Sequence, residues 1–404
     1  MTESSERFEF EKRLGAGGFG EVWLGYDTVL EAKVAIKVPY DEKKANALVH
    51  EAKLMNRIVA LQEPRVVRLS GLYEVNGKWA LVMEFIEGRG LRARIGEIED
   101  HPSPPMNAVT AIDIVSQICQ GLGTLHGAFE NEGGIFHRDI KPENILIQEP
   151  DDIVKIADFG ISKILEASGA GTTTVGTPPY MAPELCAEEG ADYRADIYSL
   201  GITFYEMLTG QLPFNPYSAP KKPKPLMPYL REIVRGYPTH PSEVADVDEE
   251  LGNIVLKALH REVNQRYQTV REFYEALENY QRTRLVDQAI AAALKETHAA
   301  ARERALARLA NDFSNDPKVY LKIAEFYAGQ FSHQKVRDIL EKGRLQCAKS
   351  PELLMHLALA YNKVKQTRWA IMALEDALQE DIPRKMRVQM QALLNNWRNA
   401  VGEE

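Results

Sequence analysis

The feature that most limits how this chain can fold is a glycine-rich turn with strand-like sequence on both sides. The segment Gly15-Ala-Gly17-Gly-Phe-Gly20 follows Phe8 and Phe10 and precedes two apolar runs, Val22-Trp-Leu24 and Val34-Ala-Ile-Lys-Val38. Apolar runs rich in β-branched residues and broken by glycine favour strands. Dinucleotide-binding loops share the G-x-G-x-x-G spacing, but they join a strand to a helix. The turn therefore predicts a loop that joins two strands and covers a ligand with its backbone. Taken alone, it could equally be a structural turn without a ligand.

The rest of the first 90 residues predicts a sheet with a single helix. Apolar residues recur at helical spacing over residues 42–61, as in an amphipathic helix. Strand-like runs follow at 66–75 and 79–85, and Asn76-Gly77 between them is a hairpin signal. We therefore expect a small, mainly antiparallel β unit.

Beyond residue 106 the pattern becomes helical, apart from two short strand-like segments. Helices are predicted at 106–126, 196–209 and 248–280, and strands at 145–147 and 154–156. The proline-rich segment 220–228 is unsuited to a regular helix, because proline lacks the backbone donor. We expect an exposed loop there.

A change of charge divides the chain near residue 280. The 404 residues are enough for two or three domains. Residues 1–280 carry 29 Lys and Arg against 43 Asp and Glu, whereas residues 281–404 carry 20 against 15. This boundary predicts two unlike units. The net charge of −9 argues against nucleic acid as a main partner.

Hydropathy and cysteine content predict a cytoplasmic location. No uninterrupted apolar stretch approaches the roughly 18 residues of a membrane-spanning helix, and residues 1–13 show no basic-then-apolar signal. The cysteines, Cys119, Cys186 and Cys347, lie far apart, which fits a reducing compartment and offers no metal-binding spacing. We therefore expect a cytoplasmic protein without a membrane span.

Residues 281–404 are almost entirely helix-compatible and contain an internal period. Pro317 and Pro351 are 34 residues apart, as are Tyr327 and Tyr361. A period of this length is typical of stacked helical hairpins. The other positions that align at this spacing are Tyr320 with Leu354, Ile323 with Leu357, Ala324 with Ala358, and Leu340 with Leu374.

In this spacing the region resembles a tetratricopeptide repeat (TPR). The first copy departs from the repeat pattern at Val336 and Gly343. Residues 285–313 would form a degenerate third hairpin and residues 384–398 a capping helix. The alternative is a helical bundle in which the period arises by chance.

The residues that carry chemistry form an ordered series. Lys37 stands in a strand-like run, and Glu51 follows 14 residues later on the predicted helix. Then come His137-Arg-Asp139-Ile-Lys141-Pro-Glu-Asn144, Asp158-Phe-Gly160 and Ala182-Pro-Glu184. A lone lysine or glutamate is usually a solvated charge, but the whole series in this order points to one family.

Residues 8–280 resemble the eukaryotic-type (Hanks) protein kinases, most closely the compact bacterial Ser/Thr kinases. The resemblance implies an α+β bilobal protein kinase fold in residues 1–280, with an N-lobe at 1–86 and a C-lobe at 87–280. An all-α, TPR-like helical hairpin domain follows at 281–404. The implied activity is transfer of the γ-phosphate of ATP to Ser or Thr of protein substrates, with Mg²⁺ as the metal cofactor and Mn²⁺ as its alternative.

The same resemblance implies roles for the motif residues. Asp139 would orient the substrate hydroxyl and accept its proton, and Lys141 would lie near the γ-phosphate. Asn144 and Asp158 would hold the metal ions. Lys141 within its motif and the segment Gly176-Thr177-Pro are the Ser/Thr forms of these sequences.

ATP would be bound by the glycine-rich loop and by apolar residues of both lobes. The resemblance implies that Lys37 binds the α- and β-phosphates and is held by Glu51. It also makes Met83 the gatekeeper at the back of the adenine slot. The expected nucleotide-binding residues are Leu14, Gly15, Ala16, Gly17, Gly18, Phe19, Gly20, Val22, Ala35, Lys37, Glu51, Met83, Glu84, Ile86, Leu146 and Asp158. The alternative for each apolar residue is ordinary core packing.

Arg138, which precedes Asp139, implies control by phosphorylation of the activation segment, residues 158–184. We also expect Glu184 to pair with Arg266, and Asp196 to anchor the catalytic loop. The candidate phosphorylation sites are Thr172, Thr173 and Thr174.

Two other classes of function are open to such a sequence. The first is a scaffold in which a silent kinase fold presents residues 281–404 to a protein or peptide partner, but Lys37, Asp139, Asn144 and Asp158 are all present. The second is a small-molecule kinase, although Ala182-Pro-Glu184 after a long activation segment favours a protein substrate. The surplus of basic residues in 281–404 predicts docking on the acidic first unit, capture of an acidic partner, or only a solvated face.

Overall fold

The computed structural model describes residues 7–16, 20–75, 77–97, 102–128, 135–158, 178–187, 190–219 and 222–401. The chain divides into two compact units, Met1–Tyr280 and Gln281–Glu404. Each has its own apolar core. The boundary falls within the helix α11 (Val270–Lys295).

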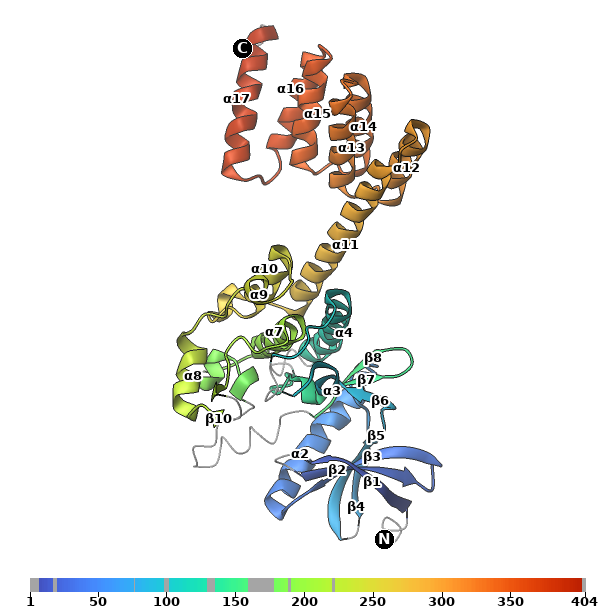
Figure 1. Cartoon of the computed structure of the whole chain (residues 1–404), viewed down its shortest axis with the longest axis vertical. Coiled ribbons are helices and arrows are strands. Elements are labelled where there is room, and N and C mark those ends of the chain that lie inside the picture. Colours follow the sequence, from blue (N-terminus) through green and yellow to red (C-terminus); the bar gives the residue numbers. More distant parts are fainter. Residues whose placement is uncertain are drawn as a thin grey trace. The chain divides into compact units, whose positions relative to one another are not determined.

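The first unit begins with a five-stranded antiparallel sheet in the order β1-β2-β3-β5-β4 (Figure 1). The helix α2 (Glu42–Val59) packs against β4 and β5, with Leu48 and Met55 buried. The predicted β unit with one helix is therefore confirmed. Its strands are β1 (Phe8–Ala16), β2 (Gly20–Asp27), β3 (Ala32–Pro39), β4 (Leu69–Val75) and β5 (Lys78–Glu84).

Helices and two small sheets make up the rest of this unit. One sheet has the order β6 (Gly88–Gly90), β7 (Ile145–Gln148) and β8 (Ile153–Ile156), of which β7 and β8 were predicted. The other pairs β9 (Tyr217–Ala219) with β10 (Lys222–Pro223), which were not predicted. The helices of this part are α3 (Leu91–Ile95), α4 (Ala108–Gly127), α6 (Pro183–Cys186), α7 (Arg194–Thr209), α8 (Leu226–Arg235), α9 (Pro241–Val244) and α10 (Glu249–Ala258), followed by α11.

The helix α7 lies at the centre of the helical part, and its residues from Ala195 to Thr209 are all buried. It ends at Gly210, whose φ of +69° is readily adopted by glycine. A Cβ atom there would also lie 1.8 Å from the carbonyl oxygen of Ser103. Glycine is therefore required at this end of the helix by both conformation and space.

Two details of the sequence-based assignment were wrong. The segment 220–228 is not wholly a loop, because α8 begins at Leu226. Pro228 lies in its first turn, where a missing backbone donor breaks no helical hydrogen bond. The helix predicted to end near Tyr280 continues as α11 to Lys295, since the sequence after Tyr280 offers no helix-terminating residue.

Among the described residues, α4 is the one helix whose length and mean hydropathy would let it cross a membrane. Nine of its residues are buried in the first unit, and it packs against α7 and β8. The core helix of a globular domain meets the same criteria, so this property is weak support for a membrane span.

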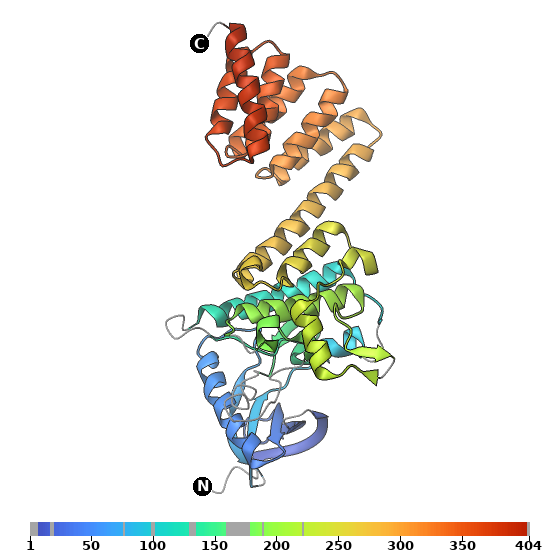
Figure 2. The same ribbon diagram turned by 90° about the vertical axis from the view of Figure 1, so that its left-hand side faces the viewer.

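The second unit is all-helical, as the predicted fold class requires. Its successive helices pack against one another as antiparallel neighbours (Figure 2). After the end of α11, these helices are α12 (Ala299–Asp312), α13 (Pro317–Gly329), α14 (His333–Gln346), α15 (Pro351–Lys363), α16 (Thr367–Leu378) and α17 (Arg384–Val401).

The 34-residue spacing corresponds to one helical hairpin. Pro317 and Pro351 each occupy the first position of a helix, after Asp316 and Ser350, whose side chains cap it. Phe331 and Lys365, also 34 residues apart, both have a left-handed backbone, with φ of +56° and +64°. The period therefore repeats in the caps and turns as well as in the apolar positions.

A large residue and a small residue compensate for each other where the first copy departs from the pattern. Gly343 lies against Tyr320, and a Cβ atom at Gly343 would be 2.7 Å from the Tyr320 ring. The second copy has Leu354 and Ala377 at the corresponding positions, both buried. The larger aromatic ring in the first copy is thus accommodated by glycine.

Candidate active site

Three residues of the predicted catalytic loop meet at the carboxylate of Asp139. Its Oδ2 lies 2.9 Å from Asn144 Nδ2 and 2.9 Å from Lys141 Nζ. Asn144 Nδ2 also donates to the backbone oxygen of Asp139, at 2.8 Å. Because Asn144 lies in the short 3-10 helix η3 (Pro142–Asn144), it folds the chain back onto Asp139. The carboxylate is therefore held by one neutral and one charged donor.

Asp196 anchors this loop from the first turn of α7, as predicted. Its Oδ2 accepts from the backbone N–H of His137 and its Oδ1 from that of Arg138, each at 2.7 Å. These bonds hold Arg138 at a φ of +64°, a costly conformation for a residue with a side chain. Burial opposes ionisation of Asp196, but the hydrogen bond to His126 holds its pKa below the usual value.

His137 supports the loop from beneath in a defined tautomer. Its Nε2 lies 3.0 Å from the carbonyl oxygen of Ala157, and its Nδ1 accepts from the N–H of Asp139 at 3.3 Å. Burial lowers the pKa of His137 despite the acidic groups around it. The ring is therefore a neutral support with its proton on Nε2.

Lys37 and Asp158, which are 121 residues apart in the sequence, form an ion pair of 2.9 Å between Nζ and Oδ1. Lys37 lies on β3, and Asp158 follows β8 with a left-handed φ of +54°. Burial opposes ionisation of Asp158, but Lys37 beside it lowers its pKa below the usual value. Glu51 lies on α2 with its side chain outside the described part, so its pairing with Lys37 stays a prediction.

The oxygen atoms at this site fit a hard divalent cation. The Asn144 amide nitrogen donates to two oxygens of Asp139, so its amide oxygen is directed elsewhere. Asp158 contributes an ionised carboxylate, and Mg²⁺ prefers carboxylate and amide oxygens together with phosphates. Among the described residues, no group of three or more His, Cys, Asp or Glu is arranged to hold a metal ion, so phosphate and water would have to complete the shell.

The glycines of the predicted phosphate loop differ in their surroundings. A Cβ atom at Gly20 would lie 2.1 Å from the carbonyl oxygen of Val38, so glycine is required there by strand packing. A Cβ atom at Gly15 would meet nothing within 4 Å. Open space thus adjoins the end of β1, where Leu14 and Ala16 are exposed. The tip, Gly17, Gly18 and Phe19, lies outside the described residues.

The expected adenine residues lie on the strands that would form the slot. Ala35 on β3 pairs with Met83 on β5. Met83 is buried, whereas Val22, Ala35, Ile86 and Leu146 are partly exposed. The contact of these residues with adenine stays a prediction. The Glu84 side chain binds Lys155 Nζ at 2.8 Å, and its backbone N–H donates to the carbonyl oxygen of Arg68 at 3.0 Å. The role of Glu84 in reading the adenine edge therefore also stays a prediction.

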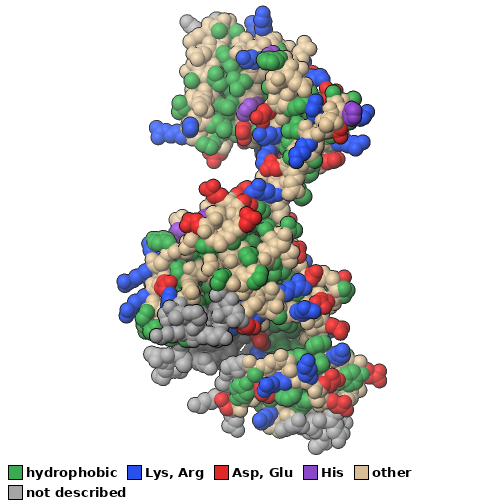
Figure 3. Space-filling model, in the orientation of Figure 1, with side chains coloured by type: hydrophobic (Ala, Val, Ile, Leu, Met, Phe, Trp, Pro, Cys, Tyr) green, Lys and Arg blue, Asp and Glu red, His purple; other side chains and the backbone are tan. Residues whose placement is uncertain are grey.

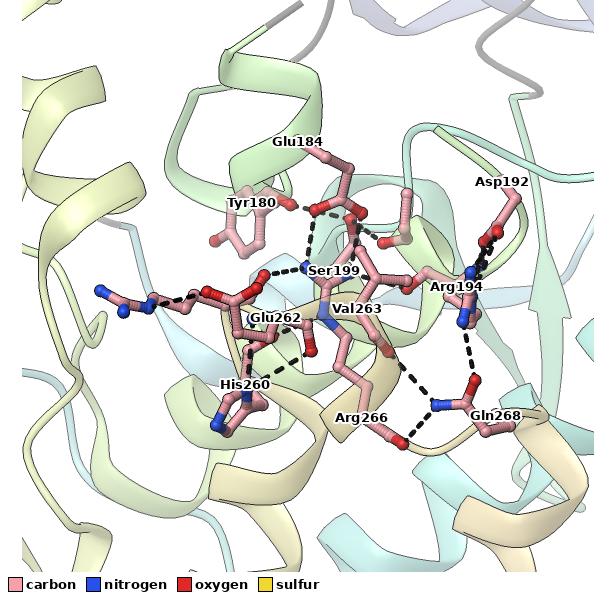
Figure 4. Close-up of polar contacts among 12 residues, drawn as sticks. Tyr180, Glu184, Asp192, Arg194, Ser199, His260, Glu262, Val263, Arg266 and Gln268 are labelled. Atoms are coloured by element: carbon pink, nitrogen blue, oxygen red, sulfur yellow. Dashed lines mark hydrogen bonds and ion pairs between the residues drawn. The ribbon is translucent and has the colours of Figure 1, made fainter. Parts of the chain in front are cut away.

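Glu184 and Arg266 form the predicted ion pair, and both are buried (Figure 4). Arg266 Nη1 and Nη2 donate to the two carboxylate oxygens, at 2.8 and 2.6 Å. Arg266 also donates to the carbonyl oxygens of His260, Arg261 and Arg194. The pair connects the start of α6 to the chain before α11.

Two supporting residues escaped the sequence reasoning. His126 Nε2 lies 2.9 Å from Asp196 Oδ2, and Lys155 binds Glu84 as described above. A single histidine at a helix end and a single lysine on a strand carry no sequence signal of such a role. The predicted sites Thr172, Thr173 and Thr174, together with Thr177, lie outside the described residues.

Comparison with known proteins identifies the family. Residues 8–278 match the protein kinase domain. Serine/threonine-protein kinase PknB of Mycolicibacterium smegmatis is 35% identical over 279 residues, which cover 66% of this chain and 42% of that protein. Serine/threonine-protein kinase Pkn1 of Myxococcus xanthus is 34% identical over 286 residues, which cover 67% and 38%. This chain therefore matches only about two fifths of the length of these relatives. With a family match over about two thirds of its own length, the chain belongs to the protein kinase domain family.

Proposed function

We propose that the protein is a serine/threonine protein kinase that transfers the γ-phosphate of ATP to protein substrates. The observation that carries the proposal is the convergence of Asn144 and Lys141 on Asp139. The Lys37–Asp158 pair also supports the proposal, because a lysine that can bind phosphate lies next to a carboxylate that can bind a metal ion. The names of the two relatives described above favour Ser and Thr as acceptors.

Each residue would act on charge or position, because phosphoryl transfer makes a loose transition state. Asp139 accepts the hydrogen bond of the acceptor hydroxyl and takes its proton, while Asn144 fixes the carboxylate. Lys37 binds the phosphate oxygens as a point charge. Asp158 and the amide oxygen of Asn144 would hold Mg²⁺, which neutralises the phosphates when bound.

The test is transfer of γ-labelled phosphate from Mg-ATP to generic Ser- and Thr-containing proteins, followed by phosphoamino acid analysis. We expect label on Ser or Thr. Label on small metabolites alone would favour a small-molecule kinase, and binding of ATP without any transfer would favour a silent scaffold.

We also propose that the kinase phosphorylates its own activation segment. Arg138 supports this, because its guanidinium stacks on Phe136 at 3.9 Å and has no carboxylate partner among the described residues. Burial lowers the pKa of Arg138 although Asp196 opposes the shift. A half-buried cation of this kind is well suited to a phosphate, which carries about −1.5 to −2 charges.

Incubation with Mg-ATP should place phosphate on Thr172, Thr173 or Thr174, as read by mass spectrometry. An Arg138→Gln variant should gain the phosphate but lose the rise in activity that accompanies it, because the phosphate then lacks its cation. Absence of phosphate on all three threonines of an active wild type would contradict the proposal.

For the second unit we propose a TPR-like domain that binds a protein or peptide. It contains a groove of about 810 Å³ between α13 and α15, with α14 as its floor. Leu321 and Leu359 line the groove, and Lys318, Lys322 and Glu325 lie beside them. On the face drawn in Figure 3, acidic and basic side chains of this unit are intermixed. This favours a partner that is bound by apolar contacts over one that is bound by net charge.

A Leu321→Asp/Leu359→Asp variant of the full chain should lose binding to the members of a random peptide array that the wild type captures, because both charges would enter the apolar groove. Leu345→Asp, at an exposed leucine of α14 outside the groove, is the matched control. Equal capture by the double variant would exclude the groove as the binding site.

A further inference from the structure

A buried cluster of charged groups lies beside the catalytic loop and takes no part in the roles assigned so far. Arg92 of α3 is at its centre, with Glu206 of α7 next to it. Glu143 joins from η3, and Tyr180 from the short 3-10 helix η4 (Pro178–Tyr180). Four separate segments of the first unit therefore meet at one guanidinium.

The guanidinium of Arg92 binds each of these segments with a different nitrogen. Its Nη1 lies 2.7 Å from Glu206 Oε1, and its Nε lies 2.9 Å from Glu143 Oε1. Its Nη2 donates to the hydroxyl of Tyr180. That hydroxyl in turn donates to Glu206 Oε2, at 2.6 Å. The cluster is thus a closed set of charge-assisted hydrogen bonds, the stronger kind in proteins.

Because these side chains are buried, each of them needs the hydrogen bonds of the cluster. Arg92, Tyr180 and Glu206 are 8%, 3% and 1% exposed, and a buried charge without a partner is strongly unfavourable. Burial alone would lower the pKa of Arg92, but Tyr180 and Glu206 beside it raise the value. Burial raises the pKa of Tyr180, as does the charge of Glu206. Arg92 therefore stays charged, and Tyr180 remains a neutral donor.

The cluster connects the catalytic loop, through Glu143, to the segment that contains Tyr180. Glu143 stands between Lys141 and Asn144, the two residues that hold Asp139. Tyr180 ends the short helix η4, near the end of the activation segment, and its carbonyl oxygen accepts from Ser199 Oγ of α7 at 2.8 Å. Glu143 lies four residues after Asp139, and Arg92 joins Glu143 to Tyr180. A protein acceptor that presents its hydroxyl to Asp139 therefore approaches the loop to which the segment around Tyr180 is tied.

We infer that Arg92 is a positioning residue that fixes the segment around Tyr180 against the catalytic loop, and so sets the place of the protein acceptor rather than that of ATP. The inference rests on the proposed kinase function. Within the described part of the chain, Arg92 forms its hydrogen bonds with Glu143, Gly96, Tyr180 and Glu206, and none of these is a residue expected to bind ATP. Loosening the cluster should therefore weaken use of the acceptor while ATP use is retained.

The test compares steady-state kinetics of full-length variants with the wild type, using the best acceptor from a Ser/Thr peptide library. Tyr180→Phe removes only the hydroxyl that joins Arg92 to Glu206, and Glu143→Gln removes the charge at the catalytic loop. We expect the KM for the peptide to rise about tenfold in each, with the KM for ATP unchanged. Arg92→Lys should give a partial effect, because lysine restores the charge but not the planar fork.

Tyr274→Phe is the matched control, because Tyr274 donates to Glu278 in an exposed bond of the same kind, at 2.7 Å. It should leave both KM values unchanged. A lower melting temperature with an unchanged peptide KM would overturn the inference, since it would make the cluster merely structural. An equal rise in the KM for ATP would also overturn it. Failure of the wild type to transfer phosphate would instead overturn the proposed function and, with it, the inference.

Discussion

Replacing Asp139 with asparagine should lower the rate of phosphoryl transfer by about 10²–10⁴-fold while ATP binding stays nearly intact. Asparagine keeps the size of the side chain but cannot accept the proton of the acceptor hydroxyl. It also leaves Lys141 without the carboxylate that it binds at 2.9 Å. Lys37 and Asp158, which would hold the nucleotide and its metal, are unchanged, so the loss should fall on kcat.

Initial rates at saturating Mg-ATP and a nucleotide-displacement titration measure the two quantities separately. Asp151→Asn provides a matched control, because Asp151 is an exposed carboxylate in the turn between β7 and β8. It should behave as the wild type does. Equal turnover of Asp139→Asn and the wild type would refute the role of Asp139.

Breaking the Glu184–Arg266 pair should cost the first unit about 3–5 kcal/mol of unfolding free energy. In Arg266→Met the Glu184 carboxylate stays buried, at 7% exposure, without its two donors. The penalty comes from that stranded charge, since a buried ion pair gains little net stability over apolar residues. Arg266→Met/Glu184→Leu should therefore recover much of the loss.

Urea unfolding followed by hydrogen exchange of peptides from α7 reports on the first unit alone. Arg271→Met is the control, because Arg271 pairs with Glu275 on the surface of α11 at 2.8 Å and exposed pairs contribute little. Small and equal losses of unfolding free energy in the single and double variants would contradict the prediction, because they would show that Glu184 is not left as a buried, unpaired charge in solution.

The parts of this site that were predictable from sequence are those in which the chemistry fixes both residue type and spacing. Asp139, Lys141 and Asn144 lie within six residues, so one loop brings them together. Asp158 and Lys37 were assigned because the whole motif series occurs in order, and their ion pair places them together. The helix α8 was missed altogether, because a proline in its first turn looks like one that ends a helix.

The supporting residues could not be predicted, because tertiary packing alone gives them partners. Arg92 is one of several arginines near residue 90, and only the approach of α7 places Glu206 against it. His126 likewise gains its role from Asp196, 70 residues away. A sequence pattern reports periodic burial and local motifs, but it does not report which distant charge will occupy a buried position.

The compensation between Tyr320 and Gly343 has a consequence for how the repeats of the second unit can change in evolution. Two copies that share a period can exchange segments by recombination. These two copies differ, however, in side-chain size at two packed positions, with tyrosine and glycine in the first and leucine and alanine in the second. A segment that brought alanine to position 343 without also bringing leucine to position 320 would place a methyl group against the tyrosine ring. Residues 320 and 343 must therefore change together. Exchange of a single helix between the copies would separate the two residues, because position 320 lies on α13 and position 343 on α14.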